Sequence, residues 1–441
     1  MRQDNPSGKV GNQAVTEYDY FLQELKIINA LGVNINIDDV FDELNIYEDL
    51  FNNVINGDIT LSESTDIINK LQIHGNEFLS ISFKSPAFKK YEKIFRIYKI
   101  TDLSMKATSV ASYKLHFCSE EFFINQQYNL SRSFKETKLS DVIKIIARNV
   151  LRIPESKLPN EAIEESTLLT SPEKNPLIIP NMRPLEAINW ICSFALSKYD
   201  LSPGFFFYEN SNGFNLRSFS NLYSSNVQKT IIYSPKNQST TASVGENHDI
   251  LDEMEFKQLF DTLDSINNGA FGSRITKVDF LNRTIDTESY SLNSNTFKLL
   301  NKYLPFNLAK NRIGNALNES STFEKMFPKF QGDLVSKWLL VRASRIALLN
   351  STKLHIDIPG DSSLSIGNII GLQVPQNTAE TDPRKIVYDP MLSGLYMIVG
   401  LRHKLVGNKY TCHAQLCKDS LGINLNYRPP FNSGWNLAIN S

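Results

Sequence analysis

Long apolar runs are missing from this sequence. No stretch reaches the about 18 apolar residues that a membrane-spanning helix needs, and the most apolar long segment, residues 338–349, is interrupted by Arg342 and Arg345. The first residues, MRQDNPSGKVGNQAV, contain no apolar core of a signal peptide. We therefore expect no stable membrane insertion, and we expect synthesis in a reducing cytoplasm.

Cysteine is scarce, and neither sign of charge predominates. The chain has four cysteines in 441 residues, too few for a disulfide framework, and we expect them to serve as small hydrophobic residues. The 46 basic and 47 acidic residues give a net charge of -1. A nucleic-acid-binding protein needs a basic face that displaces counterions. The composition therefore argues against sequence-specific nucleic-acid binding.

Motifs for catalysis or cofactor binding are also absent. The sequence has no phosphate-binding loop, no dinucleotide fingerprint after a strand and no GxSxG nucleophile elbow. The densest group of metal-ligating side chains is Cys412, His413 and Cys417. On a strand, Cys412 and Cys417 are an odd number of residues apart and face opposite sides, which favours packing over a zinc site. The sequence therefore predicts no catalytic, cofactor-binding or metal-binding residue.

What the sequence does contain is a β pattern in residues 354–421. A strand, a glycine turn and a second strand precede a long hairpin, whose Gly407-Asn408 turn favours positive backbone φ. The second arm of the hairpin alternates with a period of two. One side carries Tyr410, Cys412, Ala414 and Leu416, and the other carries Thr411, His413, Gln415 and Cys417.

The same pattern occurs near the N-terminus. GNEFLSISFKSP, which begins at Gly75, is followed by RIYKITDLSMKATSVASYKLHFCS, and the spacing of aromatic and aliphatic residues repeats. The predicted matches are Tyr98, Ile100 and Leu103 with Tyr396, Ile398 and Leu401, and Tyr113 and His116 with Tyr410 and His413. This indicates an internal duplication, and we expect residues 75–119 and 367–419 to have the same strand order.

The segment between the two copies has a different character. Apolar residues at helical spacing predict a helix from Leu139 to Val150, and Pro184 is well placed to begin a second helix. Asn212-Gly213 predicts a hairpin turn between two aromatic strands, Asn56-Gly57 predicts another turn, and residues 221–247 read as a long loop. A chain of this length is expected to form two to four domains, here of a mainly β, α+β class.

Several stretches together resemble the baseplate central hub protein of contractile-tailed bacteriophages. Residues 47–86 resemble the first tube domain of this family, and FFFYENSNGFNLRSFSNL, residues 205–222, resembles its middle domain. SINNGAFGSRITKVDFLNR, residues 265–283, resembles the start of the second half. Residues 354–420 resemble the second tube domain, with its IPGD, IG and KDS landmarks. The resemblance covers most of the chain and rests on the order and spacing of short motifs.

The resemblance implies two similar tail-tube-like β domains and smaller α+β inserted domains in each chain. The expected division is a flexible arm (residues 1–17), a first tube-like domain (18–128), a middle domain of two helices and a hairpin (129–225), a linker (226–249), the first strands of the second tube-like domain (250–290), an inserted segment (291–331), the remainder of that domain (332–423) and a tail (424–441).

The same resemblance implies a non-enzymatic, structural role in the baseplate of the virion. Three chains would form a homotrimer, and their six similar domains would make a pseudo-sixfold ring. This ring would adapt a hexameric tail tube, or its initiator protein, to a trimeric central spike and would leave a channel for genome passage. The tape measure protein and the baseplate wedges are further expected partners.

Two alternatives remain open. The spike hub of a type VI or extracellular injection machine shares the doubled tube domain, but it usually carries a fused β-helix, and the chain shows no such short repeats before Ser441. A tail-associated cell-wall hydrolase belongs to a different class. Its paired carboxylates or zinc ligands would have to come together in space, where no sequence spacing reveals them.

Overall fold

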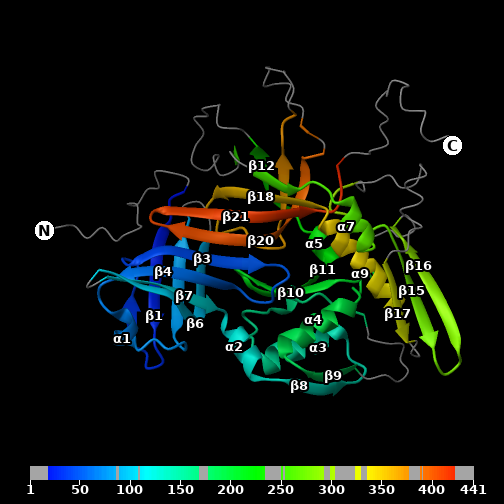
Figure 1. Cartoon of the computed structure of the whole chain (residues 1–441), viewed down its shortest axis with the longest axis horizontal. Helices are drawn as coiled ribbons and strands as arrows, with labels where there is room; N and C mark the ends of the chain where they lie inside the picture. Colours follow the sequence, from blue (N-terminus) through cyan, green and yellow to red (C-terminus); the bar gives the residue numbers. More distant parts are fainter. Residues whose placement is uncertain are drawn as a thin grey trace.

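Two sets of antiparallel strands, one from each half of the chain, join edge to edge (Figure 1). The computed structural model describes residues 18–85, 89–107, 110–167, 177–233, 250–251, 254–292, 298–302, 323–328, 335–376, 388–389 and 391–422. Fourteen strands in these ranges belong to one sheet. The fold is therefore mainly β, as predicted. No helix in the described ranges combines the length and the apolar character needed to cross a membrane.

The first half supplies the strands on one side of this sheet. Their spatial order is β3-β4-β7-β6-β5-β1-β2, and every neighbouring pair is antiparallel. Alternate side chains of these strands are buried, because one face of the sheet packs into the larger hydrophobic core. The bounds are β1 (Phe21–Ile28), β2 (Asn34–Asn36), β3 (Phe41–Asp49), β4 (Asn56–Glu63), β5 (Phe78–Lys84), β6 (Lys90–Ala107) and β7 (Val110–Cys118), with α1 (Ile67–Leu71) between β4 and β5.

The second half supplies an equivalent set. Its antiparallel order is β14-β18-β21-β20-β19, and β12 then pairs with β19 in parallel. The Gly407 turn between β20 and β21 has a φ of 55°, as the sequence predicted. The bounds are β12 (Val227–Tyr233), β13 (Ile250–Leu251), β14 (Met254–Gln258), β18 (Thr352–Pro359), β19 (Ile369–Gln373), β20 (Gly394–Val406) and β21 (Lys409–Lys418).

The two sets have the same strand order, so the predicted duplication is confirmed in the fold. The order β3-β4-β7-β6-β5 corresponds to β14-β18-β21-β20-β19. Both long hairpins also contain a bulge at the same place: the ladder shifts between Ile97 and Lys99 in β6, and between Ile398 and Gly400 in β20. A shared bulge is a specific landmark, because bulges locally bend a strand and re-aim its side chains.

The bulge corrects the residue matches that the sequence suggested. It aligns Tyr98 with Val399 instead of Tyr396, because both Tyr98 and Val399 are the extra residue of the bulge. Exposure agrees with this alignment, since Tyr98 is 48% exposed whereas Tyr396 is fully buried. Beyond the bulge the two ladders differ, because β6 has further irregularities, between Thr101 and Ser104 and between Met105 and Ala107, that β20 lacks.

A separate α+β unit lies beneath the large sheet in the view of Figure 1 and has its own hydrophobic core. The two predicted helices and the Asn212-Gly213 hairpin are present. The first helix ends as a π-helix, and Gly213 adopts a φ of 131°. The elements are α3 (Leu139–Ile145), η1 (Ile146–Val150), α4 (Pro184–Phe194), β8 (Leu130–Phe134), β9 (Leu177–Met182), β10 (Phe205–Asn210) and β11 (Gly213–Ser218), preceded by α2 (Glu120–Gln127) and followed by α5 (Phe219–Tyr223).

A separate three-stranded sheet stands beside α9 (Val335–Leu349) at the right of Figure 1. Its strands are β15 (Gly272–Asp279), β16 (Thr284–Ser291) and β17 (Phe323–Pro328), in the order β16-β15-β17, and α7 (Thr262–Asn267) precedes it. Residues 250–290 were predicted to give the first strands of the second tube-like domain. Only β13 and β14 of that range lie in the large sheet, and β15 and β16 pair with each other instead.

Two local predictions were wrong. Asn56-Gly57 is not a turn but the start of β4, and the structure shows why a glycine is needed there: a Cβ on Gly57 would lie 2.3 Å from the carbonyl oxygen of Asn45. Residues 221–247 were predicted to be a loop, but the described part, residues 221–233, contains the end of α5 and the strand β12; residues 234–247 lie outside the described residues. β12 pairs with β19 along its length and with the two-residue strand β13 at its end. The arm (1–17) and the tail (424–441) lie outside the described residues.

Candidate functional site

The two halves meet where β3 pairs with β20. This junction is an antiparallel ladder from Gly400 opposite Asp49 to Val406 opposite Glu43. It makes the strands β14-β18-β21-β20-β3-β4-β7-β6 continuous across the chain. We call the exposed side of β14, β18, β21, β20 and β3 the junction face; the opposite side of these strands contributes to the core.

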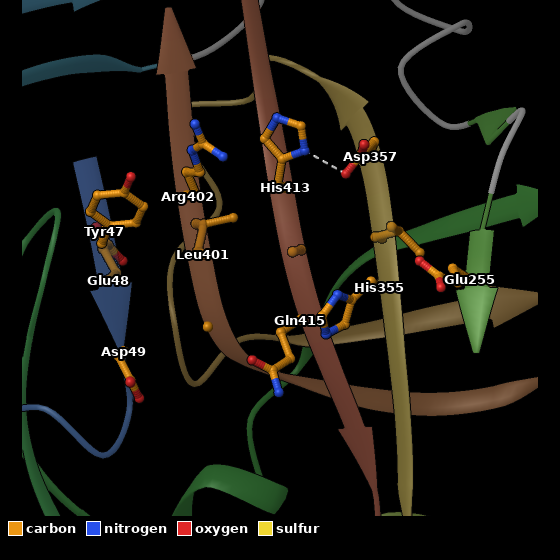
Figure 2. Close-up of a pocket in the computed structure, with 13 residues that line it drawn as sticks. Tyr47, Glu48, Asp49, Glu255, His355, Asp357, Leu401, Arg402, His413 and Gln415 are labelled. Atoms are coloured by element: carbon orange, nitrogen blue, oxygen red, sulfur yellow. Dashed lines mark hydrogen bonds and ion pairs between the residues drawn. The ribbon is translucent and has the colours of Figure 1, made fainter. Parts of the chain in front are cut away.

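The junction face is polar and slightly hollowed (Figure 2). A depression of about 440 Å³ is lined by side chains from all five strands, among them Glu255, His355 and Gln415. His413 points toward Asp357, with 2.5 Å between Nδ1 and the nearer carboxylate oxygen. These residues come from segments that are far apart in the sequence, so sequence spacing could not have revealed their proximity.

Charges on the junction face are arranged in pairs of opposite sign. The Arg402 guanidinium donates to Asn45 at 2.9 and 2.7 Å and to Glu43 at 3.0 Å, which connects the second half of the chain to the first. Lys404 lies 3.6 Å from the same Glu43 carboxylate. Burial tends to raise the pKa of Glu43, but Asn45, Lys404 and Arg402 outweigh that effect and lower it. The face therefore presents a balanced polar surface.

The Cys412, His413 and Cys417 group is divided between environments. Cys412 is fully buried beside Tyr410 and His403, and Cys417 is also buried in the core. His413 instead lies on the junction face. In the ranges that the structure describes, no three His, Cys, Asp or Glu side chains are close enough together to hold a metal ion. All four cysteines are buried as free thiols.

A buried ion pair lies within the junction. Glu48 of β3 and His403 of β20 are both inaccessible, with 3.9 Å between the Glu48 carboxylate and His403 Nε2. Glu48 also accepts a hydrogen bond from the amide of Ile366, and His403 Nδ1 lies 2.8 Å from the Tyr410 hydroxyl. Burial alone would lower the pKa of His403, but Cys412 and Glu48 raise it to about 10. These neighbours therefore favour the protonated form of His403 beside the buried carboxylate. No sequence pattern indicates this pair.

A known phage protein is similar to this chain over most of its sequence. The probable baseplate hub protein gp334 of Vibrio phage KVP40 is 20% identical to the chain over 416 residues, which cover 89% of this chain and 93% of the phage protein. The chain resembles a phage baseplate hub protein. No protein-family model matches it.

Solved structures show the same fold. A tail protein from Neisseria meningitidis MC58 matches with a TM-score of 0.53 and 11% identity, over 91% of this chain and 97% of that one. The 43 kDa tail protein of prophage MuSo2 from Shewanella oneidensis matches with a TM-score of 0.51 and 7% identity, over 91% of this chain and all of that one. Each match covers 91% of this chain, so the likeness in fold is not confined to one half of it.

The landmarks that carried the resemblance to hub proteins hold segments of the second half together. In KDS, Lys418 donates to the carbonyl of Met391, and Asp419 accepts from the amide of Leu300 at 3.1 Å. Ser420 accepts from the amide of Asn301 at 2.7 Å. Burial of the ammonium lowers the pKa of Lys418 to about 8. These side chains therefore connect the segment after β21 to the segment before β20 and to residues 300–301.

The glycine of the IPGD landmark allows two strands to approach closely. The Gly360 amide donates to the carbonyl of Tyr410 at 3.0 Å, and its own carbonyl accepts from the Ser85 hydroxyl at 2.7 Å. A Cβ at this position would lie 1.9 Å from the ring of Tyr410, which is fully buried. The neighbouring Asp361 is buried too and pairs with Lys229 at 3.3 Å.

Gly360→Ala is therefore expected to lower the free energy of unfolding by about 1–3 kcal/mol, the usual range for overpacking a rigid core. Urea denaturation of the variant would measure it. Gly422→Ala is the matched control, because a Cβ there would meet no atom within 4 Å. Equal midpoints for the two variants would show that the Tyr410 ring can move aside.

Proposed function

We propose that the chain is a structural baseplate hub of a contractile phage tail. The observation that carries the proposal is the duplicated strand order, in which one chain provides two equivalent β domains joined at the junction. The name of the Vibrio phage relative and the shared fold of the two tail proteins support it. The protein would accordingly be located in the virion, at the baseplate.

Three copies of a doubled domain would form a ring with six similar units. Such a ring matches a hexameric tail tube on one side, because its six domains are similar. It matches a trimeric spike on the other side, because it consists of three identical chains. The expected partners are the tube or its initiator, the central spike and, further out, the tape measure protein and the wedges. The role would be structural, with no catalytic step assigned to any residue.

The junction face suits the wall of a channel. Its opposite side is occupied by the core, so the polar side is the one left to face a lumen. Arg402, Lys404 and Glu43 show that both signs of charge are present and paired there. A wall without an excess of positive charge lets DNA pass without the counterion release that drives tight binding. The near-neutral chain, with a net charge of -1, agrees with this role.

The direct test is the mass of the purified protein, alone and with its spike partner. We expect a species of three times the 50.1 kDa of one chain. Native mass spectrometry or sedimentation equilibrium would measure it, and a monomer under both conditions would contradict the proposal. Clearing of peptidoglycan in a zymogram by the isolated chain would favour the hydrolase alternative instead.

A further inference from the structure

We propose that the edge strand β14 of one chain pairs with the long strand β6 of the next chain, in the register that β3 and β20 use within one chain. The inference rests on the proposed ring, and it assigns the surfaces that would close that ring. The partner is a second copy of this chain.

The internal junction gives the geometry to be repeated. β3 is the outermost strand of the first antiparallel set and pairs with β20 of the second set. The edge of β20 that pairs with β3 has a second neighbour, β19. β19 pairs with the first residues of β20, up to Met397, and β3 pairs with β20 from Gly400 onward. The opposite edge of β20 is paired with β21 along most of its length.

The equivalent strands have no such neighbours within one chain. β14 corresponds to β3, and among the described residues it pairs with β18 alone. β6 corresponds to β20: β5 pairs with it up to Arg96, while the same edge from Lys99 to Met105 has no partner strand in the described structure. In the part of the chain that the structure describes, there is therefore one open edge of each kind. Open edges of this length are ready to pair with another chain.

Exposure of apolar side chains marks the β6 edge as an interface. Leu405 of β20 is fully buried against β3, whereas Met105, its equivalent in β6, is 75% exposed. Leu103, beside it, is 56% exposed. Exposed apolar side chains that cluster along an open strand are the usual sign of a surface that another protein covers.

The residue pairing between β14 of one chain and β6 of the next follows from the strand pairings within one chain. Asn45 and Glu255 are equivalent, because they face the equivalent residues Asp58 and His355 in the next strand. Ser104 is equivalent to Lys404, because Ser104 lies opposite Ser112 and Lys404 lies opposite Thr411. Ser112 and Thr411 each lie four residues before the first partner beyond the bulge, which is His116 in β7 and Gln415 in β21. Asn45 lies directly opposite Lys404 in the junction. The inference therefore places Glu255 of one chain directly opposite Ser104 of the next.

Disulfide trapping tests this pairing. Directly opposed residues of antiparallel strands have Cα atoms roughly 4.5–5.5 Å apart, within the range that a disulfide requires. The variant Ser104→Cys/Glu255→Cys, oxidised in the full-length chain, is expected to convert the monomer band on a non-reducing gel into covalent dimer and trimer bands that a reductant reverses. Both positions are exposed in one chain, whereas all four native cysteines are buried.

Two controls make the result specific. Asn45→Cys/Lys404→Cys places the same pair within one chain, so it should form a disulfide that leaves the band at the monomer position. Thr101→Cys/Glu255→Cys shifts the register, and its yield of covalent trimer should fall well below that of the matched pair. Equal yields from the two intermolecular pairs would overturn the register.

The outcomes separate this inference from the proposed function. A trimer by mass that gives no intermolecular disulfide in Ser104→Cys/Glu255→Cys would overturn the assigned surfaces and leave the ring intact. A chain that is monomeric by mass, alone and with its spike, and is not trapped would overturn both. A covalent trimer from the matched pair, with little from the shifted pair, supports both.

Discussion

Glu209→Ala is expected to lower the free energy of unfolding by about 3–5 kcal/mol, the cost of removing one partner of a buried ion pair. Glu209 is 3% exposed and lies 2.6 Å from the ammonium of Lys93. It also accepts hydrogen bonds from the Ile55 amide at 3.0 Å and from the Ser119 hydroxyl. The carboxylate therefore connects the middle unit, through β10, to three segments of the first β domain.

The reason for the large effect is that alanine leaves three polar groups without this acceptor. A buried donor without a partner costs its full desolvation penalty, and Lys93 is itself only 12% exposed in its side chain. Urea denaturation would measure the loss, and hydrogen exchange would show faster exchange at the Ile55 amide. Glu165→Ala is the matched control, because that carboxylate pairs with Lys138 and Lys198 at an exposed site and should matter little. Similar losses for both variants would contradict the argument.

Much of the fold could be predicted because it depends on local rules. The alternation of β21, the Gly407 turn and the Pro184 helix start each follow from neighbouring residues. The duplication was visible because both copies keep the same order of apolar positions. Even there, the predicted residue matches were displaced from those that the shared bulge defines. Insertions at bulges change spacing without changing strand order.

The pairing of distant segments could not be predicted. Nothing near Asp49 in the sequence indicates that β3 pairs with β20, and nothing near Gly57 indicates that its glycine serves close packing instead of a turn. The buried pair of Glu48 and His403 is equally hidden, because its members are far apart in the chain. Such features depend on tertiary contacts, which a single sequence encodes without displaying.

His403→Gln is expected to remove a pH-dependent part of the stability of the junction. The folded pKa of about 10 lies above the roughly 6.5 of an unfolded histidine. Because the pKa is higher in the folded state, protonated His403 stabilises the fold, and the stabilisation is complete below pH 6.5. This contribution is lost as the pH rises toward 10. The stability difference between the native chain and the variant should therefore shrink by up to about 1.4 kcal/mol per pH unit in that window.

At pH 6 the variant is expected to be less stable by about 3–5 kcal/mol, because Glu48 stays buried without its cation. Urea titrations of both chains at pH 6, 7, 8 and 9 measure the difference. The pKa of Lys418 is lowered to about 8, so above that pH this residue changes the free energy of unfolding in the opposite direction. Because Lys418 is present in both chains, its effect cancels in the difference between them. Glu48→Gln/His403→Gln should lose less than the sum of its single variants, since both remove the same interaction. A difference that stays constant across the pH range would show that His403 is neutral in the junction.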